Sequence, residues 1–288
     1  MWMRYLVTQL VRQAAQEQLQ QAAKRTLTDE PDSPVEETPP PSPCALAFLF
    51  AVGAEAKGFH ELLTESHRYS LPGRIEWQGR LGPRQAAAAE CGPGQRAAAE
   101  AVRQVFAFHQ PQWVVSAGFA SALHPDLHKG HILMAEQVLD ARGESLETGL
   151  KMEASPGLHV GSLLTLDEIP NDPQQRLQWG ESRGAVAADL ETWAVAEACR
   201  QENVRFLSVR IITEGVQERP PQELEKMTRQ KTIAGRLGAA AGALFQRPSV
   251  VKELWRLRDE AHKASRKLGK FLAAAATQLT DAKNESEM

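Results

Sequence analysis

The stretch AVAADLETWAVAEACRQENVRFLSVRIITE, residues 185–214, decides the fold. Its first part predicts a strand end that leads into a helix. Its last part, RFLSVRIITE, predicts a buried strand because apolar and β-branched residues dominate it. A helix directly before such a strand is typical of α/β proteins, in which helices cover both faces of a largely parallel sheet. The segment therefore predicts an α/β domain.

The same alternation continues through most of the chain. Apolar runs typical of strands occupy residues 45–52, 86–92, 113–123, 131–141 and 160–169. Helical patterns occupy residues 54–63, 92–109 and 222–246. Together these segments predict a mixed, largely parallel central sheet with helices on both sides, and extra helices at the two ends of the chain.

Composition divides the chain into four segments. Residues 1–27 are rich in Gln and Ala and predict an amphipathic N-terminal helix. Residues 28–44 are acidic and Pro-rich, which predicts an extended linker. Residues 45–248 form the predicted globular domain, and residues 249–288 predict a C-terminal helix followed by a polar tail.

The C-terminal helix carries a regular apolar seam at spacings of four and three residues. The seam consists of Val250, Leu254, Leu257, Ala261, Ala264, Leu268, Phe271 and Ala275. Such a seam predicts packing along another helix. The partner is open among the chain's own domain, the N-terminal helix and a second subunit. Weak contact with a membrane surface is a further alternative, because Trp2 and Trp255 lie near arginines and lysines.

Composition also limits the classes of function. The chain has 288 residues and a formal net charge of −3, so no bulk positive field favours nucleic acid. No run of about 18 apolar residues predicts a membrane-spanning helix. The N-terminus, whose apolar positions are interrupted by polar ones, does not resemble a cleaved signal sequence. We therefore expect a cytoplasmic protein.

Cysteine and histidine spacing gives no metal site. The cysteines are Cys44, Cys91 and Cys199, and their wide separation is typical of a reducing compartment rather than a disulfide framework. His124, His128 and His131 lie close together in a turn that contains Pro and Gly, and we interpret them as solvated. We expect neither a metal nor a cofactor.

Three carboxylates follow predicted strand ends. In an open parallel sheet, ligands bind at the carboxyl ends of the strands. Glu55, Glu191 and Glu214 are predicted to meet there. Such a set suits cleavage of a glycosidic bond, in which one group activates a nucleophile, one protonates the leaving group and one holds the sugar hydroxyls.

Each carboxylate also has a structural explanation. Glu55 begins a helix, where a carboxylate complements the helix dipole. Glu214 lies next to a glycine and is compatible with a solvated turn. Glu191 is surrounded by apolar residues, and a buried carboxylate without partners is costly. It is therefore the strongest of the three candidates.

Four segments carry a family resemblance. They are AVGAEAKGF at residues 51–59, ECGPGQRAAAEA at residues 90–101, WVVSAGFASALHPDLHKGHILMAE at residues 113–136, and the stretch at residues 184–214. In this order they resemble the purine-nucleoside phosphorylase and methylthioadenosine/S-adenosylhomocysteine nucleosidase superfamily across residues 45–246. The resemblance implies a three-layer αβα fold with a central mixed sheet.

The resemblance also implies roles for the three carboxylates. Glu55 is implied to be the general base that activates water. Glu191 is implied to bind the ribose 2′- and 3′-hydroxyls. Glu214 stands where the family has an aspartate that protonates the purine at N7. The glutamate adds a methylene, so its carboxyl must retract to reach the same nitrogen.

Neighbouring positions are implied to shape the pocket. Leu190 stands where the family usually has a methionine beneath the sugar. Gly118 lies in the substrate-binding loop, and Phe119 occupies a position that is often serine near the ribose. Ile169 aligns with a position that contacts the base. Phe119 and Ser121 replace small or polar loop residues of the family, which suggests a reshaped and more apolar pocket.

The expected activity is hydrolysis of a 5′-substituted adenosine, such as methylthioadenosine or S-adenosylhomocysteine, to release the base. One alternative is a phosphate-dependent phosphorylase, although an acidic residue at position 55 repels phosphate. The other alternative is a nucleoside-binding or scaffold protein whose catalytic residues are eroded. The family also implies a homodimer or larger homo-oligomer.

Overall fold

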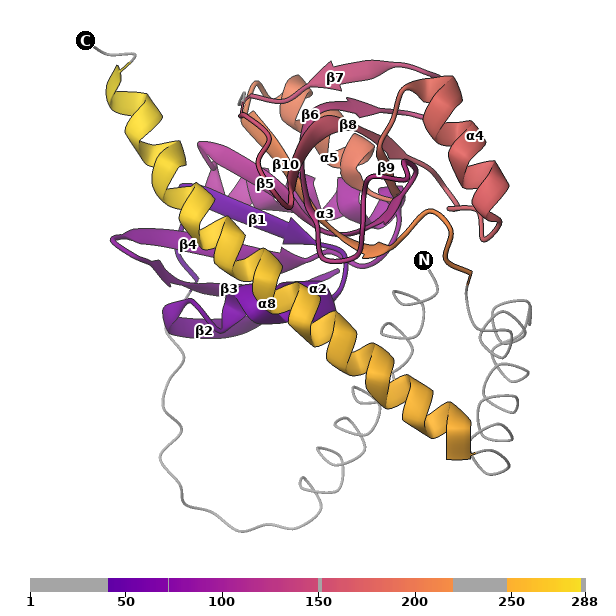
Figure 1. Cartoon of the computed structure of the whole chain (residues 1–288). Helices are drawn as coiled ribbons and strands as arrows, with labels where there is room; N and C mark the ends of the chain where they lie inside the picture. Colours follow the sequence, from indigo (N-terminus) through magenta and orange to yellow (C-terminus); the bar gives the residue numbers. More distant parts are fainter. Residues whose placement is uncertain (1–40, 72, 150–151, 220–247, 286–288) are drawn as a thin grey trace.

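The computed structural model describes residues 41–71, 73–149, 152–219 and 248–285, with side chains of the last segment described from residue 255 to 279. The strands are β1 Leu46–Phe50, β2 Thr64–Leu71, β3 Arg74–Leu81, β4 Arg84–Glu90, β5 Trp113–Ala122, β6 Ile132–Leu139, β7 Ser145–Glu147, β8 Leu158–Thr165, β9 Ala187–Asp189 and β10 Arg205–Glu214. The helices are α2 Gly53–His60, α3 Gln95–His109, α4 Pro173–Arg183, α5 Thr192–Gln201 and α8 Pro248–Glu285. The expected mixed α/β fold is confirmed (Figure 1).

Within these residues the strands form one mixed sheet. β5 is its central strand, because it pairs in parallel with both β1 and β10. Together with the β10–β5 pairing, the pairings β10–β6, β6–β8, β8–β9 and β9–β5 close a ring of five strands. On the other side of β5 the sheet continues through β1, β4 and β3 to β2. The carboxyl ends of β1, β4, β5 and β10 therefore lie at the same edge.

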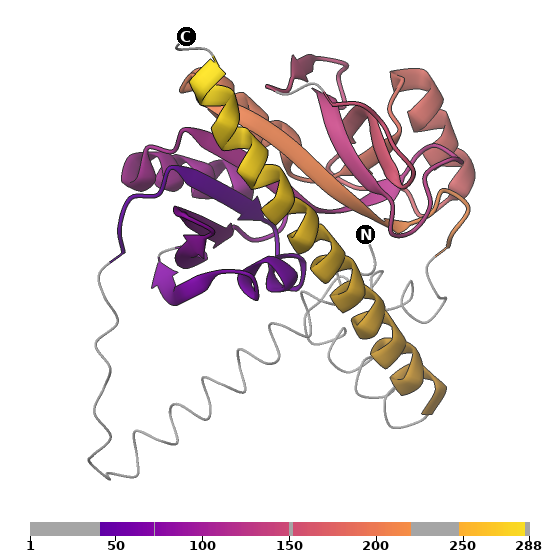
Figure 2. The same cartoon turned by 60° about the vertical axis from the view of Figure 1, so that its left-hand side comes forward.

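Helices cover the sheet from two directions. One apolar cluster joins α2 and α8 to the strands through residues that include Phe48, Phe59 and Leu268. A second cluster joins α3 and α5 to the opposite side through residues that include Val105 and Val195. Figures 1 and 2 show α8 running diagonally across the domain and past α2.

β4 is built mostly of alanine, a poor strand former, yet the strand predicted there is confirmed. β4 lies between β1 and β3, and its side chains alternate between the two apolar clusters. Pairing on both edges outweighs the intrinsic propensity of alanine.

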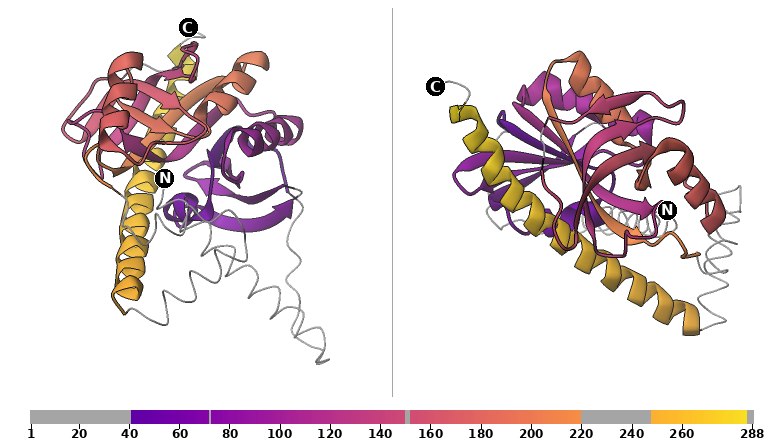
Figure 3. Two further views of the ribbon diagram at one scale, coloured as in Figure 1. Left: turned by 90° about the vertical axis from the view of Figure 1, so that its right-hand side faces the viewer. Right: turned by 45° about the horizontal axis from the view of Figure 1, so that its top comes forward.

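Helix α8 packs on the chain's own domain, which is the first of the three alternatives for its seam. The buried positions are Leu257, Ala261, Ser265, Leu268, Leu272, Ala276 and Leu279. The predicted seam is confirmed at Leu257, Ala261 and Leu268. It is wrong at Ala264 and Phe271, which are only partly buried and whose next residues, Ser265 and Leu272, are buried instead. The observed pattern repeats every 11 residues, which matches a straight helix better than the seven-residue repeat of a supercoiled one. Figure 3 shows that α8 extends straight past the sheet at its N-terminal end.

Several predictions fall outside the described residues. These are the helix at residues 1–27, most of the linker at residues 28–44 and the helical pattern at residues 222–246. The division of the chain into four segments therefore stays a prediction. In the part of the chain that is described, no helix is long and apolar enough to cross a bilayer.

Candidate active site

Glu55 lies in the first turn of α2, directly after β1, and its side chain is fully buried. One carboxylate oxygen accepts hydrogen bonds from the backbone N–H groups of Ala51 and Val52, at 3.0 and 3.3 Å. The other oxygen accepts the N–H of Phe119 at 2.8 Å. A Cβ on Gly118 would lie 2.9 Å from this carboxylate, so a larger residue would displace it. Glu55 is thus fixed between the β1–α2 turn and the end of β5.

Glu214 is the last residue of β10 and is 4% exposed. The hydroxyl of Ser121 donates a hydrogen bond to its carboxylate at 3.0 Å. The register between β10 and β5 shifts between Ile212 and Glu214, and an irregularity of this kind re-aims a side chain. Since Ser121 lies two residues after Phe119, the end of β5 contacts both Glu214 and Glu55.

Glu191 precedes α5 and accepts the backbone N–H of Gly94 at 2.8 Å. It lines a small cavity together with Ala51, whose N–H binds Glu55. Cys91 lines the same cavity, and burial raises the pKa of its thiol to about 12, with the negative charge of Glu191 adding to the effect. Glu55 contributes in the same direction. Glu191 therefore lines the cavity itself, and Glu55 borders it through its hydrogen bond with Ala51.

The route by which Glu191 reaches this space differs from the expected one. β9 pairs antiparallel with β5, with Ala188 opposite Ser121. Glu191 therefore follows the carboxyl end of a strand that is parallel to β8 but antiparallel to β5. The ring of five strands brings β9 back alongside the end of β5. The turn after β9, which carries Glu191, therefore lies beside the end of β5.

A buried ion pair supports the turn that carries Glu191. Arg210 of β10 donates hydrogen bonds to Asp189 of β9 from Nε at 3.1 Å and from Nη2 at 2.9 Å. Both side chains are buried, and Arg210 Nη2 also binds the hydroxyl of Ser116 on β5 at 2.7 Å. The pair therefore joins β9, β10 and β5, and Arg210 and Ser116 line the cavity.

Threonines complete this arrangement. The hydroxyl of Thr165 donates to Asp189 at 2.8 Å and accepts the N–H of Trp193 at 2.9 Å. The N–H of Thr192 donates to Asp189 at 3.2 Å, and its hydroxyl contacts the same carboxylate. Glu191 lies between Asp189 and Thr192 in the sequence, so these bonds fix its backbone from both sides.

A second buried arginine joins two loops beside Glu214. Arg176 of α4 is 1% exposed and donates hydrogen bonds to the carbonyl oxygens of Asn171 at 3.2 Å, of Gly215 at 3.0 Å and of Glu218. Burial lowers the pKa of Arg176, while the negative charge of Glu214 acts in the opposite direction. This side chain ties the loop after β8 to the loop after β10.

Sequence reasoning missed Arg210, Asp189 and Arg176 as supporting residues. Arg210 had a signal, because it interrupts the apolar strand RFLSVRIITE and a buried charge needs a partner. Asp189 had the same signal within AVAADLE. Arg176 had none, since it belongs to a helix of mostly polar sequence.

The predicted pocket residues fall into two groups. Ile169 is buried in a cluster against which Leu190 packs, so these two positions lie together. The side chain of Phe119 instead belongs to the apolar cluster beneath α2 and α8, and its backbone N–H is the part that contacts Glu55. The side chain of Phe119 thus stabilises the α2 side of the domain.

Among the described side chains, no group of three or more His, Cys, Asp or Glu residues has the arrangement of a metal site. His131 lies 2.8 Å from His159 and its ring packs on that of His128. Cys44, Cys91 and Cys199 are buried free thiols. Their wide spacing in the sequence predicted no disulfide framework.

The sequence matches the model of the phosphorylase superfamily over residues 45–158. This range runs from β1 to the first residue of β8 and contains Glu55 and Gly118, whereas Glu191 and Glu214 lie beyond it. The resemblance to the nucleoside phosphorylase superfamily is confirmed. A comparison with curated proteins finds no significant match.

Solved structures of nucleosidases share this fold. A 5′-methylthioadenosine/S-adenosylhomocysteine nucleosidase from Helicobacter pylori superposes with a TM-score of 0.61 at 15% identity, covering 83% of this chain and 100% of that one. A futalosine hydrolase mutant from the same organism gives 0.60 at 15% identity, with 81% and 98% covered. The corresponding nucleosidase from S. pneumoniae, solved with a transition-state inhibitor, gives 0.60 at 15% identity, with 80% and 96% covered. At these identities the likeness establishes the fold.

Proposed function

We propose that this protein is a nucleosidase that hydrolyses the N-glycosidic bond of a 5′-substituted adenosine, such as methylthioadenosine or S-adenosylhomocysteine. The main support is the Glu55 carboxylate. It is buried, held by three backbone N–H groups and fixed at the end of β5, which also contacts Glu214. Two carboxyl groups on one side of a sheet supply the base and the acid that glycosidic cleavage requires.

In this proposal each carboxylate has one role. Glu55 takes a proton from water as the water attacks the anomeric carbon. Glu191 holds the ribose 2′- and 3′-hydroxyls while positive charge develops on the sugar. Glu214 donates a proton to the purine N7 so that the base leaves neutral. The register shift before Glu214 supports this last role, because it offers a way to offset the extra methylene.

The relatives of this fold favour the same substrate class. Two of the similar structures are 5′-methylthioadenosine/S-adenosylhomocysteine nucleosidases, and one of these was solved with a transition-state inhibitor. Water suits a site whose base is a glutamate better than phosphate does, because a carboxylate repels an anionic nucleophile. Leu190 and Ile169 offer an apolar surface for the base and sugar.

Adenine release tests the proposal. The purified full chain is incubated with methylthioadenosine, S-adenosylhomocysteine and other 5′-substituted adenosines, with and without phosphate. We expect phosphate-independent release of adenine and a free sugar. Glu55→Gln should lower kcat by about 10²- to 10⁴-fold, the range that a general base supplies. Glu100→Gln is the matched control, because Glu100 is an exposed carboxylate whose partner is Arg103 on the same helix.

Each of the other results has a clear meaning. Turnover that requires phosphate and yields a sugar phosphate would identify a phosphorylase. Binding of nucleosides without cleavage, unchanged by Glu214→Asp, would identify an eroded binding protein. If the chain binds and cleaves no nucleoside and Glu191→Gln changes nothing, the site assignment fails. Under the proposal, Glu214→Asp preserves or raises activity.

The proposal also covers the architecture, the oligomeric state and the cellular location of the protein. We propose the three-layer arrangement of the family, a homodimer and a cytoplasmic location, to which the three buried free thiols add support. Membrane contact through α8 has less support, because the apolar face of this helix packs in the domain. Sedimentation velocity of the full chain tests the dimer.

A further inference from the structure

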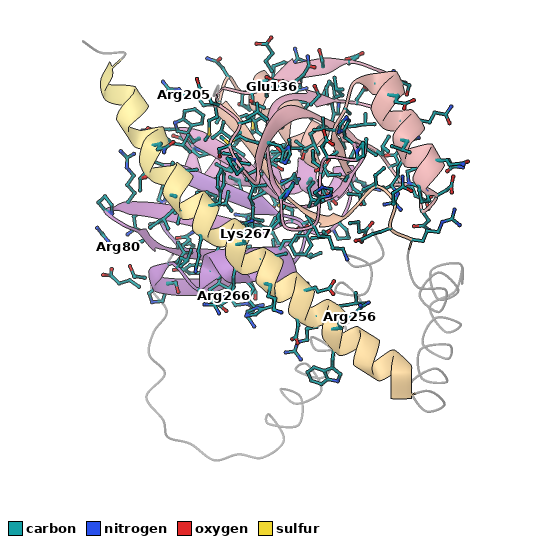
Figure 4. All side chains as sticks on the ribbon, viewed as in Figure 1. Arg80, Glu136, Arg205, Arg256, Arg266 and Lys267 are labelled. Atoms are coloured by element: carbon teal, nitrogen blue, oxygen red, sulfur yellow. The ribbon has the colours of Figure 1, made fainter. Side chains whose placement is uncertain are left out.

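Helices α2 and α8 cross so closely that the backbone of one lies against the backbone of the other. A Cβ on Gly58 of α2 would lie 2.3 Å from the carbonyl oxygen of Ser265 in α8. A Cβ on Gly269 of α8 would lie 2.4 Å from the carbonyl oxygen of Gly58. The crossing therefore admits no side chain at either glycine. In Figure 4 the labelled Arg266 and Lys267 mark the part of α8 where this crossing occurs.

Ser265 bonds to α2 at this crossing and is fully buried. Its hydroxyl oxygen accepts the backbone N–H of Gly58 at 2.7 Å. The same hydroxyl donates to the backbone carbonyl oxygen of Glu55 at 2.9 Å. Ser265 is thus bonded to the turn of α2 that carries the candidate base.

The position of α2 decides whether Glu55 keeps its hydrogen bond to β5. The bonds from Ala51 and Val52 belong to the same turn as Glu55 and move with it. The bond from Phe119 comes from another strand, so its 2.8 Å length depends on where α2 lies relative to β5. Helix α8 contacts both α2 and β10, and β10 pairs with β5. Helix α8 can therefore fix the position of α2 relative to β5.

We propose that Ser265 is a positioning residue for Glu55, and that the Gly58–Gly269 crossing makes its bonds possible. The inference rests on the proposed function, in which Glu55 is the base. Ser265 acts through the backbone of Glu55 and does not contact the substrate. Helix α8, which lies beyond the segment that matches the family model, thereby fixes the position of the candidate base through this one side chain.

The test compares Ser265→Ala with Thr277→Ala in the full chain. Both variants remove one hydroxyl from α8, but the hydroxyl of Thr277 bonds to Ala274 within the same exposed stretch of helix. A small misplacement of a catalytic group lowers the rate without weakening substrate binding to the same extent. We expect Ser265→Ala to lower kcat roughly 10-fold while KM changes by less than about 2-fold. Thr277→Ala should match the wild type in both constants.

Amide hydrogen exchange gives a readout that does not need turnover. Peptides that cover residues 47–59 and 115–120 report the N–H groups bonded to Glu55. In Ser265→Ala, exchange should rise in both peptides relative to Thr277→Ala, while the peptide of α3 stays protected. Retained protection at Phe119 would overturn the positioning role, whether or not the protein cleaves nucleosides.

The two proposals can fail separately. If the wild type cleaves nucleosides and Glu55→Gln abolishes this, but Ser265→Ala matches Thr277→Ala, the positioning role is wrong and the function stands. If the wild type cleaves none, yet exchange at Phe119 rises in Ser265→Ala, the mechanical link holds and the proposed chemistry fails. A general rise in exchange across all peptides would show loss of fold and count against a local role.

Discussion

The two halves of the candidate site hold their carboxylates by different means. Glu55 is held by backbone N–H groups, and its helix is held by a crossing built on Gly58. Glu191 lies in a turn that is held by side chains, above all by the buried ion pair of Asp189 and Arg210. The first half depends on close backbone approach, and the second depends on charge.

The two halves therefore tolerate different substitutions. Backbone donors survive most side-chain changes, so the Glu55 half should be disturbed mainly by added bulk. A buried charge depends on its partner, so the Glu191 half should be disturbed by removal of a single charged group.

The largest effect is expected from Arg210→Met. The substitution leaves Asp189 buried without its cation, and breaking a buried pair in this way costs about 3–5 kcal/mol. Chemical denaturation should measure this loss as a lower free energy of unfolding. In the double variant with Asp189→Asn, much of the loss should be recovered, because both charges are gone. A single variant as stable as the wild type would contradict the role of the pair.

A smaller effect is expected from Gly58→Ala. The added methyl meets the backbone of α8 at 2.3 to 2.4 Å, so the two helices must move apart. Overpacking of this kind typically costs about 1–3 kcal/mol. Thermal unfolding should show the loss, and kcat should fall as well. Gly149→Ala is the matched control, since a Cβ there meets no atom closer than 3.5 Å.

A further effect is expected from acid, at a buried carboxylate outside the site. Glu76 accepts hydrogen bonds from His109 at 2.9 Å, from Gln78 at 2.6 Å and from Arg74 at 2.9 Å. Burial acts to raise its pKa, but these bonds outweigh burial and lower the pKa to about 2, from an ordinary value of 4.5. Glu76 is therefore held by side chains, as Asp189 is.

The sign of the pH effect follows from this shift. Because the folded-state pKa is below the unfolded value, the stabilisation is present above about pH 4.5 and is lost as the pH falls toward about 2. Melting temperatures measured between about pH 6 and pH 3 should fall more steeply for the wild type than for Glu76→Gln. Parallel curves for the two proteins would contradict the prediction.

Much of the fold was predictable because buried strands are rich in apolar residues, which the sequence shows directly. The strands β1, β5, β8 and β10 are rich in apolar residues, and each overlaps a strand predicted from the sequence. β2 and β3 were missed. β2 is largely exposed and its TESHRYSL sequence has no apolar face, while the buried positions of β3 include the polar residues Arg74, Glu76 and Gln78. A strand of this kind is specified by the partner it pairs with and not by its own residues.

The sequence alone determined which residues carry the proposed chemistry. Glu55, Glu191 and Glu214 each stand next to a strand end or inside an apolar segment, and such local signals are present in the chain itself. Only the tertiary structure decided how these residues are held. The reversal of β9, the pairing of Asp189 with Arg210 and the contact of Ser265 with α2 all join residues far apart in the sequence. Local patterns report burial, whereas the partner of a buried group depends on the path of the whole chain.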